Sequence, residues 1–177
     1  MPNYCDCYIN IKGEVDLIKH LYDQIQTKKE FLNILVPRPE DQEDNWYEWS
    51  VENWGTKWDL DEDQIKGLEY TKINSSTAQI DGCVLTAWGP PMDAFDNYIY
   101  DVEEKSDCEK EADIKCVYWE AGMGFAGIYH NGDDECITYG ELTKKEVMKN
   151  EILQEVAETF SDFTDVMYCR DEESDEE

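Results

Sequence analysis

The sequence predicts a single α+β domain over residues 1–170, followed by an acidic tail at residues 171–177. Several short segments alternate apolar and polar residues, as half-buried strands do. Other segments carry apolar residues at helical spacing, as helices with one buried face do. No internal repeat and no clear linker interrupts this mixture, and 177 residues suit one domain.

The first segments predict a strand, a helix and a break. Residues 5–11 alternate apolar and polar side chains, which predicts a strand that ends at Gly13. Residues 15–25 place apolar side chains at helical spacing. A short apolar run at 31–36 then meets two prolines within residues 37–39, which predict an extended segment.

The middle of the chain predicts a short helix and a pair of strands. Residues 46–53 are expected to be helical, with Gly55 ending the helix, and residues 56–60 are a candidate for a further strand. Residues 68–73 and 77–88 carry strand patterns separated by an Asn-Ser-Ser turn.

The C-terminal half predicts a helix, three antiparallel strands and a last helix. Apolar residues from Met92 to Val102 recur on one helical face. The three strands are expected at 114–120, 125–130 and 135–139, and the last helix at 144–160.

The net charge is the most unusual property of the chain. It has 43 acidic and 15 basic residues, which gives −28, whereas the solubility of a small domain needs a magnitude of only about 2–8. Adaptation to high salt is disfavoured because only Arg38 and Arg170 among the bases are not lysines. Since self-repulsion on this scale destabilises a compact state, we expect a function to maintain it.

Several observations predict a cytoplasmic protein without a membrane partner. No apolar run approaches the roughly 18 residues of a transmembrane helix. The N-terminal residues have neither the basic nor the apolar region of a secretory signal. The seven cysteines are odd in number and scattered, which predicts reduced thiols.

A possible metal site is weak in this sequence. Cys5 and Cys7 share one face of the predicted strand with apolar residues, and the only histidines are His20 and His130. Without a C-x-x-C pair, core packing of the two cysteines is the favoured interpretation. We therefore predict no metal and no cofactor.

Two further motifs match known sites only in part. Gly122, Gly124 and Gly127 have the spacing of a dinucleotide fingerprint, but a strand and an Asn-Gly-Asp turn follow instead of a helix, which favours a glycine-bearing hairpin. Asp59-x-Asp61-x-Asp63 begins like a calcium loop. Gln64 and Tyr70 stand where that loop needs Gly and Glu, so a solvated acidic loop is favoured.

The tryptophans of one acid-rich segment leave two interpretations open. Trp46, Trp49, Trp54 and Trp58 lie close together with Tyr47. They form either part of the core or a partly exposed aromatic anchor inside an acidic rim, which is the composition of a binding hot spot.

Five motifs together resemble a known family. They lie at residues 1–5, 31–39, 46–58, 86–91 and 118–127, and the Asn-Trp-Gly-Thr-Lys-Trp string at 53–58 is specific. They resemble the YubB-type ferredoxin-like domain family of phages, plasmids and prophage-bearing bacteria. The resemblance implies a ferredoxin-like antiparallel sheet with helices packed on one face, here with an additional hairpin and C-terminal helix. It implies a mobile-element origin and no established activity, and the acidic blocks exceed the family pattern.

The charge favours a basic protein partner over nucleic acid. Affinity for phosphates comes from Lys and Arg, so direct nucleic-acid binding is disfavoured. A host protein that normally binds nucleic acid would be attracted instead, such as a defence nuclease (RNA-guided ones included), a restriction enzyme or a polymerase. The net charge equals that of about 48 Å of duplex DNA at one charge per about 1.7 Å. We therefore predict a DNA-mimicking inhibitor, as a monomer or a homodimer, whose partner contacts are Glu40, Asp41, Glu43, Asp44, Trp46, Trp49, Asp59, Asp61, Glu62, Asp63, Glu103, Glu104, Asp107 and Glu109.

Two alternatives remain from other functional classes. The first is an interaction module that binds through the tryptophan segment while its acids serve solubility. The second, less favoured, is an enzyme that uses clustered carboxylates to hold a metal. No Ser-His-Asp or Cys-His arrangement stands out, so we expect no catalytic residues.

Overall fold

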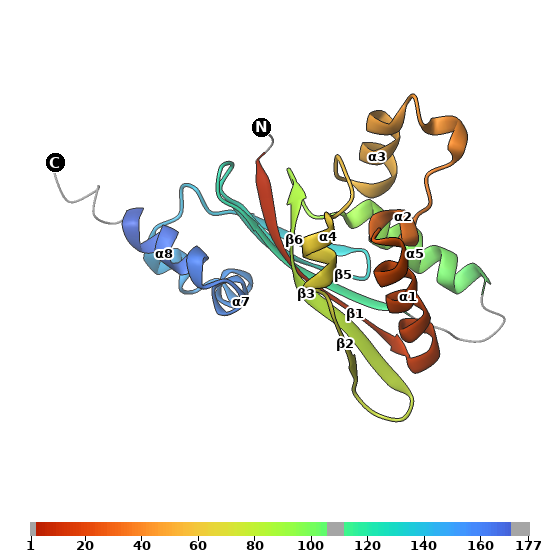
Figure 1. The fold of residues 1–177 in the computed structure, drawn as a ribbon. Helices are drawn as coiled ribbons and strands as arrows, with labels where there is room; N and C mark the ends of the chain where they lie inside the picture. The colour runs from red at the N-terminus through yellow and green to blue at the C-terminus, as the bar shows by residue number, and fades with distance from the viewer. Residues whose placement is uncertain (1–2, 106–111, 171–177) are drawn as a thin grey trace.

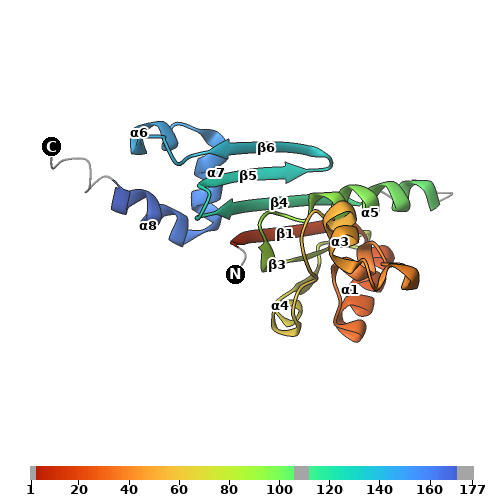
Figure 2. The ribbon, with the colours of Figure 1, turned by 90° about the horizontal axis from the view of Figure 1, so that it is seen from above.

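The computed structural model describes residues 3–105 and 112–170. The chain has an α+β fold built on a six-stranded antiparallel sheet with the strand order β2-β3-β1-β4-β5-β6. Figure 2 shows the order from β3 to β6 from above, and Figure 1 labels β2. The predicted fold class is confirmed at this level. The strands are β1 (Tyr4–Glu14), β2 (Glu69–Lys72), β3 (Thr77–Ala87), β4 (Asp113–Glu120), β5 (Phe125–His130) and β6 (Asp133–Thr138).

Helices precede, connect and follow these strands. In the described part of the chain they are α1 (Val15–Lys28), α2 (Leu32–Leu35), the 3-10 turn η1 (Glu40–Gln42), α3 (Trp46–Trp54), α4 (Glu62–Lys66), α5 (Met92–Lys105), α6 (Lys144–Val147), α7 (Glu151–Thr159) and α8 (Ser161–Arg170). None of these helices combines the length and the apolar character that crossing a bilayer requires.

The central strand β1 organises the first core. Cys5, Cys7, Ile9 and Ile11 alternate along it and are all buried, as the sequence pattern predicts. They face α1 and α5, which lie on one side of the sheet in Figure 1. The strand continues through Gly13 to Glu14, where α1 begins, so its predicted end was slightly early.

A second core lies on the opposite face. Val117 and Trp119 alternate with the first-core residues of β4, so both faces of this strand are buried. The helices α7 and α8 cover this face, and Figure 1 shows them across the sheet from α1 and α5. The Phe163 ring of α8 lies 5.6 Å from Trp119 and 5.0 Å from Tyr139, centroid to centroid. The helices α1 and α5 therefore share one face of the sheet, while the additional C-terminal helices, which the sequence did not assign to a face, cover the other.

Helix caps explain two further corrections. The predicted helix over 144–160 is divided because Thr143 and Glu146 form a capping box that begins α6, while the Asn150 side chain accepts from the Leu153 N–H and begins α7. Residues 56–60 form no strand, and α4 follows them instead.

The predicted hairpin between β5 and β6 is confirmed. His130 pairs with Asp133, which leaves Asn131 and Gly132 as a two-residue loop. Both have positive φ angles, +48° and +91°, as a type I′ turn requires.

Candidate interaction site

One buried threonine fixes the segment after α3 to the end of β3. The outer neighbour β2 pairs only with residues Ala78 to Asp81 of β3, so the rest of that edge needs other hydrogen-bond partners. The Thr56 hydroxyl donates to the carbonyl of Ala87 (2.9 Å) and accepts from the Ala87 N–H (3.1 Å). Thr56 thereby holds the residues after α3 beside the C-terminal end of β3.

This connection brings three aromatic rings around one lysine and a fourth ring beside them, in a cluster that we call the aromatic platform. Its members are Trp46, Tyr47, Lys57, Trp58 and Trp88. Lys57 Nζ lies 4.8 Å from the centre of the Trp58 ring, 5.7 Å from that of Tyr47 and 5.9 Å from that of Trp88. The Tyr47 ring meets Trp88 and Trp46 edge to face, with centroids 6.1 and 5.9 Å apart. These are the geometries of cation–π and aromatic pairs.

Three of the four rings of the aromatic platform are exposed, while Trp58 is half-buried. Trp46, Tyr47 and Trp88 keep 40%, 43% and 39% of their surface accessible. Among the described residues, no carboxylate forms an ion pair with Lys57, so the rings are its neighbours instead. Contiguous exposed rings mark interaction surfaces, because aromatic residues dominate the energetics of protein interfaces.

The backbone of Trp88 is in a strained conformation. Its φ angle is +73°, in the left-handed region that side chains other than glycine rarely adopt. This conformation costs an L-residue about 1–2 kcal/mol. The Trp88 N–H donates to the carbonyl of Asn3 (2.9 Å), which holds the turn in place. Strain of this kind is concentrated at functional positions, so it adds to the case for the aromatic platform.

The tryptophans of residues 46–58 divide between the two interpretations that the sequence left open: some belong to the core and others to the exposed surface. Trp54 is 2% exposed and donates from Nε1 to the carbonyl of Val36 (2.9 Å). Trp49 is half-buried, with its ring centroid 5.4 Å from that of Trp54. These two belong to the first core, whereas Trp46 and Trp58 belong to the aromatic platform.

The acids of the first block lie next to this surface in the chain. Glu40, Asp41, Glu43 and Asp44 are all exposed, in η1 and the residues that lead into α3. Residues 39–56 hold six acidic residues and no lysine or arginine. Their charge is therefore uncompensated within the segment.

The acids between Asp59 and Asp63, which form a second acidic block, have separate roles. Asp59 accepts hydrogen bonds from the backbone N–H groups of Phe31, Leu32, Asn33 and Leu60 at 2.7–3.1 Å, and so caps the start of α2. Burial raises the pKa of its carboxyl, while these N–H groups act to lower it. The carboxylate of Asp59 is therefore occupied by hydrogen bonds within the protein, and Asp59 is not among the partner contacts that we propose.

The remaining acids of that block belong to α4. Asp61 is the N-cap, since its side chain accepts from the N–H groups of Asp63 and Gln64. Glu62 pairs with Lys29 and Lys66, which hold the pKa of its carboxyl below the usual range. The segment is thus a capped helix start and not the solvated loop that the sequence suggested.

The third group of predicted contacts falls at the end of α5. Glu103 belongs to this helix, and Glu104 is exposed on it. Asp107 and Glu109 lie outside the described residues, as does the predicted tail at 171–177.

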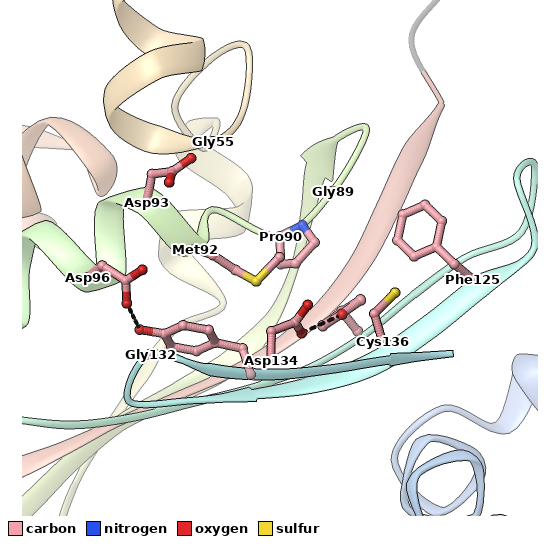
Figure 3. Close-up of a pocket in the computed structure, with 12 residues that line it drawn as sticks. Gly55, Gly89, Pro90, Met92, Asp93, Asp96, Phe125, Gly132, Asp134 and Cys136 are labelled. Carbon is pink, nitrogen blue, oxygen red and sulfur yellow. Dashed lines mark hydrogen bonds between the residues drawn. The ribbon is translucent and has the colours of Figure 1, made fainter. Parts of the chain in front are cut away.

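A pocket of about 400 Å³ is shown in Figure 3. Its lining includes Gly89, which follows Trp88 of the aromatic platform in the chain. It lies between the start of α5, the end of α3 and the strands β4 to β6. The Tyr129 hydroxyl donates to Asp96 Oδ1 (2.5 Å), and the Tyr118 hydroxyl donates to Asp134 Oδ1 (2.6 Å). Burial, together with these carboxylates, raises the pKa of both tyrosines. Burial and the nearby charge of Asp96 also raise the pKa of Asp93 at the rim.

A missing side chain at Gly127 makes room for one of these hydrogen bonds. Tyr118 of β4 must reach across β5 to Asp134 of β6, and Gly127 lies between them. A Cβ at Gly127 would come within 2.5 Å of the Tyr118 hydroxyl oxygen. The third glycine of the G-x-G-x-x-G pattern is therefore a packing feature of a hairpin, as the sequence analysis favoured.

The two candidate cysteine ligands lie apart from the two histidines. Cys5 and Cys7 are fully buried in the first core. His20 is exposed on α1, and His130 pairs with Asp113 at 2.7 Å. Groups of three or more His, Cys, Asp and Glu that could hold a metal do not occur among the described residues.

Sequence reasoning missed several site residues. Trp88 was assigned to the end of a strand and to one motif of the family resemblance but not to the site, although the Gly89-Pro90-Pro91 run after it signals a turn. Lys57 was quoted only within a family motif. Tyr118 appeared only within the motif at 118–127, and Asp134 gave no signal for a site, because long-range strand pairing brings the two together.

The fold and the site together define a highly acidic α+β protein with an exposed aromatic and acidic surface. Comparison with protein-family models, with curated proteins and with solved structures finds no match to this chain.

Proposed function

We propose that this protein binds a basic protein that normally binds nucleic acid. The observation that carries the proposal is the exposed aromatic platform beside the base-free acidic segment 39–56. Exposed rings supply anchoring contacts in the centre of an interface. Uncompensated carboxylates supply attraction to a basic surface and speed the encounter in a salt-sensitive way.

Binding at the nucleic-acid site would make the protein an inhibitor that mimics the charge of DNA. The net charge of −28 and the family resemblance support this setting. Under the proposal the protein comes from a phage or another mobile element, acts in the host cytoplasm and occupies a defence nuclease, a restriction enzyme or a polymerase. It binds rather than catalyses.

We also propose that the first four strands form a ferredoxin-like unit. The elements β1, α1, β2, β3, α5 and β4 follow one another as strand, helix, strand, strand, helix, strand, and their sheet order is β2-β3-β1-β4. The short helices α2 to α4 are then an insertion between α1 and β2, and this insertion contributes most of the aromatic platform.

A capture experiment tests the proposal. The tagged protein is incubated with extract of cells that naturally carry the gene, and captured proteins are identified by mass spectrometry at 0.1 and 0.5 M NaCl. Two variants are compared with the wild type. One is Trp88→Gly, and the other neutralises the first acidic block by Glu40→Gln, Asp41→Asn, Glu43→Gln and Asp44→Asn.

A matched control carries the same change of charge elsewhere, on exposed residues of other elements, by Glu69→Gln, Glu141→Gln, Glu151→Gln and Glu158→Gln. We expect a basic nucleic-acid-binding protein to be captured by the wild type and the control at low salt, and to be lost from both test variants. Capture that persists at 0.5 M NaCl and fails only with Trp88→Gly would favour the interaction module without mimicry, because exposed charge attraction is screened there. Equal capture by all four proteins would reject the proposed surface.

A further inference from the structure

The pocket beside the aromatic platform has walls of two kinds. Met92, Pro90 and Phe125 supply apolar surface, and Figure 3 shows Met92 beside Pro90. Asp96 of α5 and Asp134 of β6 supply carboxylates. A cavity with apolar walls and a few fixed charged groups is the usual form of a site for a compact ligand.

Two of the three carboxylates that line this pocket, those of Asp96 and Asp134, are oriented but form no ion pair among the described residues. Each of these two accepts a tyrosine hydroxyl through Oδ1, and in the described part of the chain no hydrogen bond reaches Oδ2 of either. The segments that line the pocket fall within residues 39–56, 73–104 and 116–143, and none of these contains a lysine or an arginine. The segments that line the pocket therefore contribute no lysine or arginine that could offset the negative charge of its carboxylates.

The ligand that fits these walls is a planar cation. A guanidinium group presents several N–H donors in one plane to carboxylates, and its flat faces stack on aromatic rings. The half-buried ring of Phe125 provides such a face, whereas the buried Tyr118 and Tyr129 act through the hydroxyls that orient the carboxylates. An ammonium group has no flat face and holds its water more strongly, so it fits less well.

The pocket is placed to receive a side chain of a partner bound at the aromatic platform. Gly89 lines the pocket and directly follows Trp88, while Gly55 lines it two residues before Lys57. Asp93, Asp96 and Asp134 are exposed, so the pocket opens to solvent. We infer that this pocket binds an arginine side chain, and, resting on the proposed function, that the arginine belongs to the basic partner.

The test uses a small arginine probe and a local reporter. The protein is labelled with ¹³C on the methionine methyl groups, and N-acetyl-L-arginine methylamide is titrated while the Met92 signal is followed. Met92→Leu assigns that signal, and the exposed Met123 and Met148 serve as internal references. The neutral citrulline analogue and the lysine analogue are titrated in parallel.

We expect the arginine probe to shift the Met92 signal saturably and to leave the two references in place. The citrulline analogue should have no effect, and the lysine analogue should bind at least fivefold more weakly. The double variant Asp96→Asn with Asp134→Asn should weaken the response at least fivefold, whereas Glu158→Gln, a change of charge on α7, should not. Amide spectra confirm that each variant is folded.

Three outcomes would overturn the inference: an unmoved Met92 signal, an equal response to citrulline, or an equal response to lysine. None of these outcomes would contradict the proposed function, because the capture experiment tests that function separately, through the aromatic platform and the first acidic block. If instead capture fails while the arginine probe shifts Met92, the arginine pocket stands and the proposed partner does not.

Discussion

The hydroxyl of Tyr118 lies 2.6 Å from Oδ1 of Asp134, with the whole of strand β5 between the two residues. This span is possible because Gly127 leaves the tyrosine ring free to lie across β5. This hydrogen bond also fixes the position of Asp134, which lines the pocket.

Replacement of Gly127 by alanine should displace Tyr118. The new Cβ would lie 2.5 Å from both the Tyr118 hydroxyl oxygen and the carbonyl oxygen of Glu135, so the ring or the strand must move. Overpacking of this kind costs about 1–3 kcal/mol of unfolding free energy. Chemical denaturation measures the loss. Gly89→Ala, whose Cβ would meet nothing within 4 Å, is the matched control, and an unchanged midpoint for Gly127→Ala would contradict the packing account.

Thr56→Val should destabilise the protein without changing its volume. The substitution removes the hydroxyl that both donates to and accepts from the backbone of Ala87. It leaves two backbone groups at a buried position without partners, which costs about 1–3 kcal/mol for each unsatisfied group. Thermal unfolding checks this. Because Thr56 also positions Lys57 and Trp58, tryptophan fluorescence of the folded variant should change as well, and a wild-type spectrum would show that Thr56 does not hold the aromatic platform.

Trp88→Gly and Trp54→Ala should differ sharply in stability. Glycine adopts a φ of +73° without penalty, so relief of about 1–2 kcal/mol of strain offsets the lost contacts of a partly exposed ring. We expect the unfolding free energy to change by less than about 1 kcal/mol, whereas truncation of the buried Trp54 should cost about 3–5 kcal/mol. Urea titrations of the two variants give both values. A large loss for Trp88→Gly would mean that this residue serves the core.

Stability should fall at alkaline pH because of a buried tyrosine. Burial raises the pKa of Tyr98 to about 12, above its value of about 10 in the unfolded chain. The folded state therefore keeps a proton that the unfolded state loses. The contribution of Tyr98 to the unfolding free energy should be steady below about pH 10 and decrease by about 1.4 kcal/mol per pH unit between about pH 10 and 12. Other groups with a raised pKa, such as Tyr118 and Tyr129, add to the total decrease. Tyr98→Phe should flatten the decrease, as followed by denaturant titration at several pH values. An identical slope in this variant would be evidence against the assignment.

The regular parts of the fold were predictable because local patterns determine them. The alternation of Cys5 to Ile11 and the Asn131-Gly132 turn each express one short-range rule, and the structure has both features. The helix α4 was missed because five residues carry no helical period, so only the cap formed by Asp61 distinguishes it from a loop. Local sequence could not reveal the carboxylate of Asp59 beneath α2, because its hydrogen-bond partners lie far away in the chain.

The candidate site was predictable only in part. Its acids and Trp46 were visible as composition, and Trp54 was visible as an alternative core residue. Its geometry depends on Thr56 meeting Ala87 across a sheet edge, which also recruits Trp88. Neither the contact between Thr56 and Ala87 nor the pocket beside it could be predicted from a local sequence pattern.

The most direct measurement is a competition between this protein and DNA for the partner recovered by capture. A fluorescently labelled DNA duplex is bound to the partner, and its anisotropy is followed as the protein is added. We predict that the wild type and the variant neutralised at Glu69, Glu141, Glu151 and Glu158 release the DNA, and that neutralisation of Glu40, Asp41, Glu43 and Asp44 weakens release at least tenfold. A stable ternary complex of partner, DNA and protein would contradict the account.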